Sequence, residues 1–460
     1  MKIGIIGAGI SGLTLGYELQ RRGIDYHLWE ASAEPGGYIR SRRDTPADGG
    51  QTYLRELGPN SLLGDDDLLE WLDGLGLTPE LVFSKPVSKA RYIFRSGQYR
   101  RLPSGPSSLL LGRIGEPSFF SWKTKLAILR ERTNKTVSPE GETLAQFFRR
   151  RFSDEIVDYA LTPFVAGIYA GDPERLLVSE TFPVLLQYER DYGSVLRGLI
   201  KNQSTAGRRQ SFSFRDGMQT LPRALAAQLT HLSLNNPVER ISRAGDDGWW
   251  VESATGTQTV DRLVLAAGAD ATAWLVSNPD LNNHYSAFAD ALRRVEYPPM
   301  TAVHSAYKRA DVRHPLNGFG GLNPKREGRF AAGHIWSSSV FDGRCPNDEV
   351  LFTTFVGGQG SADNARQPDD VVFRNVHQEL ADAFGISATE PTFRTIYRWE
   401  RAIPQYNEHI VTVRQQVDTI RADNLLVCAN WYGGLSLSDC LGKARNLAEE
   451  LSSGGLTNKF

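Results

Sequence analysis

The sequence predicts a protein of mixed α/β and α+β class, in which a domain built on a parallel sheet is joined to a mixed-sheet domain and a helical subdomain. Three observations support this fold class. The chain starts with a strand, a glycine turn, a helix and a second strand in immediate succession. Short apolar strands of the same kind return at 262–268 and 424–430. The segment 104–135 instead mixes apolar, aromatic and basic residues, a pattern typical of amphipathic helices.

The first element is a strand at 2–6, an apolar run with β-branched residues that is typical of a strand buried on both faces. It leads into Gly7-x-Gly9-x-x-Gly12 and then into a helix that spans 11–22. Gly7 allows a tight turn, Gly9 lets the backbone approach a pyrophosphate, and Gly12 lets the helix pack on the strand. This order of elements predicts a Rossmann-type dinucleotide site, whereas the glycine motif alone would indicate only a βα turn.

A second strand is expected at 25–29 and ends at Glu30. Its carboxylate can accept hydrogen bonds from ribose hydroxyls and disfavours a 2′-phosphate. The pair Gly36-Gly37 and the cation of Arg40 follow, and they suit the close approach and the charge of a diphosphate. The second glycine pair favours FAD over NAD as the cofactor, although Arg40 alone could be a solvated surface residue.

Composition narrows the function classes. With 52 basic and 53 acidic residues, the formal net charge of −1 gives no global attraction to nucleic acid, and we expect none as a partner. The three cysteines are scattered, and the eight histidines lack metal-ligand spacing, so we expect reduced thiols and no metal. We find no signal peptide and no apolar run of about 20 residues. We therefore expect a cytoplasmic protein, either free or peripheral on the inner face of the membrane.

Later segments return to the parallel sheet. The motif at 56–61 is expected to lead into a helix, with Asn60 or Ser61 as its cap. Near the C-terminal end, a strand at 424–430, a glycine turn at 431–438 and a helix follow one another. The N–H groups of this turn could lie against the flavin, where negative charge builds up on reduction. The alternative is that this segment is simply the last βα unit of the sheet.

The middle of the chain has a different residue composition. The basic and aromatic segment 104–135 suits a membrane interface, but equally a helical subdomain with a solvated basic face. Strand patterns at 329–341 and 350–356, within 297–355, predict an antiparallel sheet that forms a substrate chamber. The domains expected from this organisation are a discontinuous FAD-binding domain (1–84, 211–276 and 396–460), a substrate-binding domain (85–103 and 277–395) and a helical subdomain (104–210).

With these motifs in view, the chain resembles the FAD-dependent oxidases of the protoporphyrinogen oxidase type, within the flavin amine oxidase superfamily. The matching stretches keep the family's order across almost the whole chain, and they are GAGISGL, EPGGYIRS, ELGPNSL, FVAGIYAGDP, FRDGMQTLP, IWSSSVF, FVGG, WERAIPQY and GGLSLSDCLGKA. The first two are shared by many FAD enzymes. FVAGIYAGDP with the preceding Pro163, WERAIPQY and the terminal turn are the more specific ones.

The resemblance implies oxidation of a porphyrinogen to a porphyrin in three cycles, with O2 as acceptor and hydrogen peroxide as product. It implies that Arg91 faces a substrate carboxylate and that the carbonyl of Gly167 guides a proton. Without the resemblance, Arg91 would be a surface strand residue and Gly167 a helix break. The residues implied to contact FAD are Gly7, Gly9, Ile10, Ser11, Gly12, Glu30, Ala31, Gly36, Gly37, Arg40, Gly58, Pro59, Asn60, Ser61, Val238, Ala266, Trp399, Ala429, Asn430, Leu435, Ser436 and Leu437.

The chain departs from the family at its terminal turn. Leu435-Ser436-Leu437 stands where small residues are frequent, and Ala429 stands where glycine is common. The added bulk could reshape the pocket beside the flavin. Protoporphyrinogen and coproporphyrinogen therefore both stay open as substrates. So do an amine or desaturase substrate, a non-catalytic FAD-binding or porphyrin-binding protein, and a homodimer.

Overall fold

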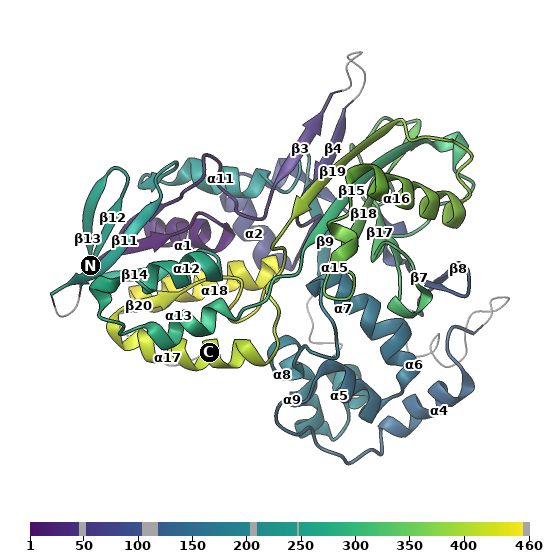
Figure 1. Ribbon diagram of the computed structural model, residues 1–460, viewed down its shortest axis with the longest axis horizontal. Helices are drawn as coiled ribbons and strands as arrows, with labels where there is room; N and C mark the ends of the chain where they lie inside the picture. The colour runs from purple at the N-terminus through teal and green to yellow at the C-terminus, as the bar shows by residue number, and fades with distance from the viewer. Residues whose placement is uncertain (46–51, 104–117, 203–208, 246–247, 454–460) are drawn as a thin grey trace.

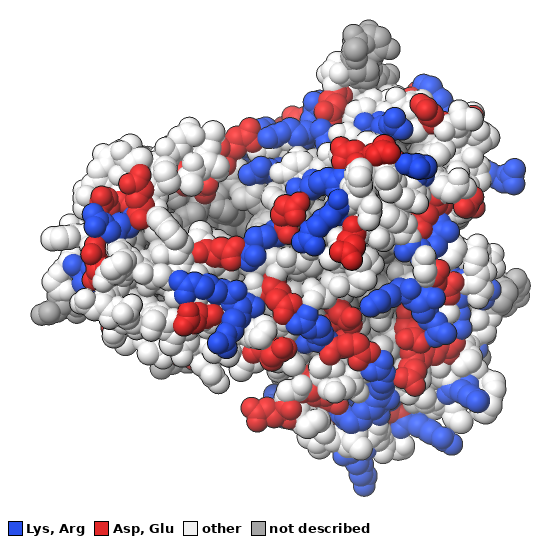
Figure 2. Space-filling model, in the orientation of Figure 1, with Lys and Arg blue, Asp and Glu red and all other residues white. Residues whose placement is uncertain are grey.

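The computed structural model describes residues 1–45, 52–103, 118–202, 209–245 and 248–453. Figure 1 shows three regions: a parallel sheet with its helices on the left, a mixed sheet at the upper right, and a group of helices at the lower right. Basic and acidic side chains are interspersed over the face drawn in Figure 2, as a net charge of −1 would lead one to expect.

The parallel sheet has the strand order β10-β2-β1-β14-β20. Alternate residues of β14 point to opposite faces, so that Leu263 and Leu265 join one hydrophobic core and Val264 the other. Helices cover both faces, which makes this a doubly wound sheet. The strands are β1 (Lys2–Ile6), β2 (Asp25–Trp29), β10 (Leu232–Ser233), β14 (Arg262–Leu265) and β20 (Leu425–Val427).

Each face of this sheet has its own set of helices. One core contains residues of α1 (Ile10–Arg21), α2 (Asp66–Gly74), α11 (Thr220–Gln228) and α18 (Leu437–Ser452). The other contains residues of α12 (Ala269–Val276), α13 (Ser286–Arg293) and α17 (Glu408–Ile420). A separate antiparallel meander joins β11 (Val238–Ala244), β12 (Gly248–Ser253) and β13 (Gly256–Val260). The strands expected at 2–6 and 25–29 and the C-terminal helix are confirmed, whereas the strand expected at 424–430 is strand only at Leu425–Val427.

The second large sheet has the order β19-β15-β18-β17-β16-β7-β8. It is mixed rather than purely antiparallel, because β16 and β7 pair in parallel. The helix α16 (Asp369–Phe384) packs into its core. The strands are β7 (Arg91–Arg95), β8 (Gln98–Arg101), β15 (Met300–Lys308), β16 (Gly320–Leu322), β17 (Gly333–Trp336), β18 (Glu349–Gly357) and β19 (Phe393–Trp399).

Two sequence predictions about these elements are wrong. The expected strand at 329–341 is strand only at β17, because Ser337–Val340 turns into the short helix α14. Neither Asn60 nor Ser61 caps the helix that follows them. Instead Leu62–Gly64 forms β5, and the carboxylate of Asp65 accepts the hydrogen bond of Leu68 N at the start of α2.

Two small sheets connect these regions. β5 and β6 (Leu81–Phe83) both pair with β9 (Gln210–Phe214), while β3 (Ser41–Asp44) pairs with β4 (Tyr53–Glu56). The short helix α15 (Ala362–Ala365) packs on β18. The helical region contains α4 (Trp122–Glu131), α5 (Leu144–Arg151), α6 (Asp154–Ile156), α7 (Thr162–Tyr169), α8 (Val178–Thr181), α9 (Pro183–Tyr192) and α10 (Val195–Asn202).

Part of the basic segment, residues 104–117, lies outside the described residues. The remainder forms α4, where Trp122 is 70% and Leu129 is 51% exposed beside Lys123 and Arg130. Among the described helices, none has the length and hydrophobicity needed to cross a membrane.

Candidate active site

The glycine turn between β1 and α1 has a shape that a side chain would destroy. Gly7 has a φ of +107°, and a Cβ on Gly12 would lie 2.0 Å from the Gly7 carbonyl oxygen. A Cβ on Gly9, in contrast, would have no atom of the described chain within 4 Å. Gly9 is also the N-cap of α1, and no side chain caps the helix there. The N–H groups at the helix start, including those of Ile10 and Ser11, thus border open space that suits a phosphate.

The second glycine pair lies directly against this turn. Gly36 forms an isolated parallel bridge with Gly9, and its N–H donates to the Ala8 carbonyl at 2.8 Å. Gly37 has a φ of +59°, and a Cβ on it would lie 3.4 Å from Gly9 Cα. The two motifs therefore form one cradle of exposed backbone. This is the close approach that a dinucleotide pyrophosphate requires.

Glu30 lies at the end of β2, beside the same turn. Its Oε2 accepts from Ala8 N at 2.7 Å, and its Oε1 accepts from Ser32 N at 2.9 Å. These bonds fix the carboxylate and leave it lone pairs for ribose hydroxyls. The neighbouring Ala31 is part of this loop, and Asn236 N donates to the Glu30 carbonyl two residues before Val238.

Arg40 is held at the edge of the cradle by contacts that do not neutralise it. Its guanidinium lies 5.6 Å from the centre of the Trp399 ring, and it donates to the Gly37 carbonyl and to the Tyr397 hydroxyl. Trp399 Nε1 donates to the Leu57 carbonyl at 2.6 Å. The segment that contains Gly58, Pro59, Asn60 and Ser61 is thereby joined to the cradle.

The C-terminal turn is held by a buried lysine. Lys443 Nζ donates to the carbonyls of Ala429, Tyr432 and Gly434, and burial lowers the pKa of this ammonium group. Asn430 accepts from the Tyr406 hydroxyl at 2.7 Å. The turn residues Leu435, Ser436 and Leu437 lead into α18, whose N-cap is Ser436 in a capping box with Asp439.

This turn belongs to the same region as the glycine cradle. The helices α18 and α1 pack against each other. Trp431 Nε1 donates to the Ala267 carbonyl at 2.9 Å, and the adjacent Ala266 lies against Gly7. Predicted FAD residues from both ends of the chain thus lie beside the parallel sheet, while Val238 belongs to the antiparallel meander and Trp399 to the mixed sheet. Their exposed backbone, carboxylate and guanidinium match the donor and acceptor set that FAD needs.

Arg91 starts β7 and pairs in register with Gly320 of β16, which in turn pairs with Ile335 of β17. Its guanidinium lies 4.4 Å from the centre of the Phe319 ring. Arg91 is an exposed residue, although partial desolvation of its guanidinium lowers its pKa, and no carboxylate of the described residues pairs with it. An exposed guanidinium that is held over an aromatic ring and has no acidic partner is suited to bind a carboxylate from outside the chain.

Gly167 lies in the last turn of α7, and a Cβ on it would lie 3.2 Å from Leu322 Cδ2. Its carbonyl is one of the last four in the helix, which have no intrahelical donor. Leu322 belongs to β16, the strand beside Arg91. The structure thus brings both predicted substrate residues to β16, although they come from different regions.

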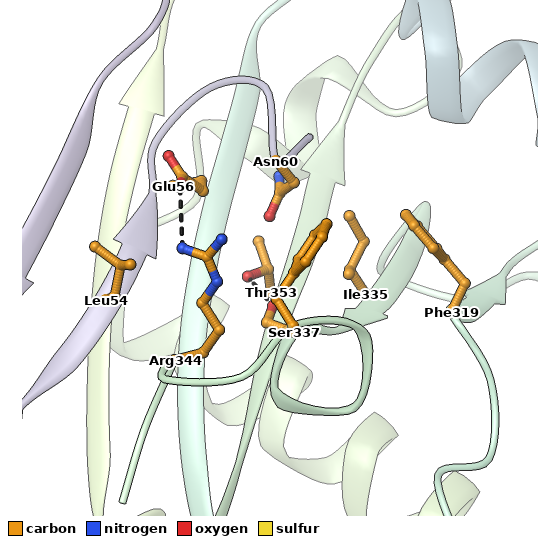
Figure 3. Close-up of a pocket in the computed structure, with 9 residues that line it drawn as sticks. Leu54, Glu56, Asn60, Phe319, Ile335, Ser337, Arg344 and Thr353 are labelled. Atoms are coloured by element: carbon orange, nitrogen blue, oxygen red, sulfur yellow. Dashed lines mark hydrogen bonds and ion pairs between the residues drawn. The ribbon is translucent and has the colours of Figure 1, made fainter. Parts of the chain in front are cut away.

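A small cavity lies beside Phe319, as Figure 3 shows. About 10 Å³ within it is open to the centre of a water molecule. Glu56 and Arg344 lie at one end and Phe319 at the other. The lining residues are Leu54, Glu56, Asn60, Phe319, Ile335, Ser337, Phe341, Arg344 and Thr353.

Sequence reasoning missed the Glu56–Arg344 pair, although Glu56 stands within the ELGPNSL motif. The two residues are far apart in the chain, and no spacing rule predicts that they meet.

Metal ligands and reactive thiols are other kinds of chemistry that a site could use. Among the residues that the structure describes, no group of three His, Cys, Asp or Glu side chains could hold a metal ion. Burial raises the pKa of the Cys428 thiol to about 12 and that of Cys345 to about 11, so neither is a ready nucleophile.

Comparisons with known proteins agree with this geometry. The family model for flavin-containing amine oxidoreductases matches residues 10–452. The chain is 31% identical to the mitochondrial protoporphyrinogen oxidase of Nicotiana tabacum, over 97% of this chain and 94% of that protein. It is 27% identical to the protoporphyrinogen oxidase of Homo sapiens, over 96% and 97% of the two chains.

Two solved structures share the fold. A provisionally named protoporphyrinogen oxidase from Exiguobacterium superposes with a TM-score of 0.78 at 22% identity, covering 99% of each chain. The cyclohexylamine oxidase of Brevibacterium oxydans superposes with a TM-score of 0.68 at 15% identity, covering 98% of this chain and 99% of that one. At these identities the likeness concerns the fold alone.

Proposed function

The chain belongs to the flavin-containing amine oxidoreductases and is an FAD-dependent oxidase, and we propose that it converts a porphyrinogen to the porphyrin in haem biosynthesis. The observation that carries this proposal is Arg91. It is an exposed residue whose guanidinium lies over the Phe319 ring and pairs with no described carboxylate. Porphyrinogens carry carboxylates that such a group binds, whereas simple amine substrates do not.

The residues of the chain mainly position the substrate. The bound FAD supplies a two-electron acceptor for hydride from a substrate carbon, once in each of three cycles. Arg91 holds a substrate carboxylate, while Phe319, Ile335 and Leu322 offer apolar surface to the macrocycle. The carbonyl of Gly167 accepts a hydrogen bond from a pyrrole N–H and so orients the ring.

The proposed electron acceptor is dioxygen. Three O2 molecules would take up the six electrons and six hydrogens that a porphyrinogen loses, and they would form three molecules of hydrogen peroxide. This ratio is measurable with purified protein in air, by porphyrin fluorescence and a peroxide assay. A peroxide yield far below three per porphyrin would indicate a different acceptor.

Anaerobic mixing with each porphyrinogen tests the substrate. We expect protoporphyrinogen or coproporphyrinogen to bleach the flavin absorbance within one turnover. If neither does so, the proposal is refuted, and bleaching by an amine would instead indicate an amine oxidase. The rates with the two porphyrinogens, compared at equal concentration, decide between them.

We further propose that α4 contacts a membrane surface. Trp122, Leu126 and Leu129 recur at the spacing of one helix face, with Lys123 and Arg130 beside them. In a flotation assay the protein should rise with vesicles that contain anionic lipids, whereas a Trp122→Ser/Leu129→Ser variant should not bind them and should remain in the bottom fraction. Equal flotation of the wild type and the variant would argue against membrane contact through this face of α4.

A further inference from the structure

The small cavity beside Phe319 contains polar groups that the proposed binding of the porphyrinogen does not use. Arg344 is 3% and Glu56 is 4% exposed, and Arg344 Nη1 lies 3.3 Å from Glu56 Oε1. Arg344 Nη2 is buried without a hydrogen-bond partner in the described chain. The hydroxyls of Ser337 and Thr353 lie 2.8 Å apart on the same lining. A water in this space would therefore meet several polar partners.

The cavity extends from Glu56 toward the substrate residues. Figure 3 shows Glu56 and Arg344 at one end, Asn60 above the space, and Ile335 and Phe319 toward the other end. Phe319 is the ring on which Arg91 stacks. The cavity thus lies between a buried carboxyl group and the residue proposed to bind the substrate.

Glu56 is held firmly in this position. Its Oε2 accepts from the Ser41 hydroxyl at 2.5 Å, and its Oε1 accepts from Met218 N at 2.9 Å. Ser41 itself accepts from Gln219 N at 3.1 Å. A carboxyl group that is oriented in this way, pairs with one arginine and borders a water-sized space can act as a general base.

We propose that Glu56 accepts the protons that the substrate releases during its oxidation, through a water molecule held in this cavity. The inference rests on the proposed oxidation of a porphyrinogen. In the first two cycles a C–H bond breaks with loss of hydride and an N–H bond with loss of a proton; in the third, both the hydride and the proton leave bridging carbons, because a porphyrin keeps two of its four N–H groups. The hydride carries two electrons to FAD, the proton moves by way of water to the Glu56 carboxylate, and three cycles remove six hydrogens in all.

The ionisation of Glu56 suits this task. Burial raises its pKa to about 7, although the charge of Arg344 and the bond from Ser41 favour the ionised form. Such a group can gain and lose a proton near neutral pH. Burial also lowers the pKa of His304, whose Nε2 lies 3.1 Å from the Glu56 carbonyl, to about 3, so that this ring stays neutral. The charged and titratable neighbours are Arg344, His304, Arg43 with its partner Asp216, and Arg55 with its partner Asp44.

The test is the rate of anaerobic flavin reduction by a porphyrinogen, measured for the holoenzyme between pH 6 and 8. In the wild type the rate should fall as the pH drops through about 7, because a protonated Glu56 cannot accept a proton. Glu56→Gln should reduce the rate at pH 8 by about 100-fold and remove this pH dependence. Glu56→Asp, which keeps a carboxylate, should restore part of the rate and of the pH dependence.

Two further variants separate a chemical role from a structural one. Glu56→Gln/Arg344→Met removes the buried pair as a unit, so that no lone charge is left buried if the single variant folds poorly. It should reduce flavin as slowly as Glu56→Gln. Glu379→Gln changes another buried glutamate with a raised pKa, outside the cavity, and should keep the wild-type pH profile.

Wild-type rates and pH dependence in Glu56→Gln and in Glu56→Gln/Arg344→Met, with normal FAD content, would overturn the inference while leaving the proposed function intact. A wild type whose flavin no porphyrinogen bleaches would overturn the proposed function, and this inference with it.

Discussion

The glycine cradle permits a sharp comparison between two alanine substitutions three residues apart. A Cβ at position 9 would have no described atom within 4 Å, and the backbone there has a φ of −68°, which alanine adopts readily. Gly9→Ala should therefore change the free energy of unfolding of the FAD-depleted protein by no more than about 0.5 kcal/mol. It should nevertheless weaken FAD binding at least about tenfold, or about 1.4 kcal/mol, because the methyl group would occupy the space expected to hold the pyrophosphate.

Gly12→Ala should instead destabilise the folded protein itself. Its Cβ would lie 2.0 Å from the Gly7 carbonyl oxygen, which is backbone and cannot rotate away. We expect the free energy of unfolding of the FAD-depleted protein to fall by about 3 kcal/mol, at the upper end of overpacking costs. Denaturant unfolding and FAD titration by fluorescence measure the two effects separately. If Gly9→Ala keeps wild-type FAD affinity, or destabilises the depleted protein as much as Gly12→Ala, the assignment of this space to the pyrophosphate is refuted.

Three further outcomes are expected. Arg91→Ala should raise KM for a porphyrinogen about tenfold with FAD content unchanged, and loss of FAD instead would make Arg91 a structural residue. Lys443→Met should weaken FAD binding in a fluorescence titration, because three backbone carbonyls of the turn lose their donor, and unchanged affinity would show that the turn keeps its shape without it. Burial lowers the pKa of His304 and His334 to about 3, below the ordinary value of 6.5, so the unfolded chain binds more protons at acid pH. The free energy of unfolding should thus fall as the pH drops below about 6.5. His334→Gln should reduce the slope of unfolding free energy against pH by about 1.4 kcal/mol per pH unit, measured by denaturant unfolding at several acid pH values. An unchanged slope would contradict burial of His334 as the cause.

Much of the dinucleotide domain could be predicted from local sequence. The strand at Lys2–Ile6, the turn at Gly7 and the helix that follows are consecutive, so their geometry depends on residues close together in the chain. The C-terminal helix was predictable for the same reason, since its apolar residues recur with helical spacing. The cap of α2 was mispredicted because Leu62–Gly64 pairs with a strand far along the chain, which no local pattern reveals.

The sequence by itself determined the cofactor cradle, because glycines at fixed short spacing control how closely backbone can approach a phosphate. Only the tertiary structure decided that Gly36 meets Gly9 and that the C-terminal turn joins the same region. It alone brought Glu56 against Arg344, in a buried space beside Phe319. The reason is physical: a buried ion pair depends on which strands and loops pack together, and that packing minimises exposed apolar surface over the whole chain rather than within any short segment.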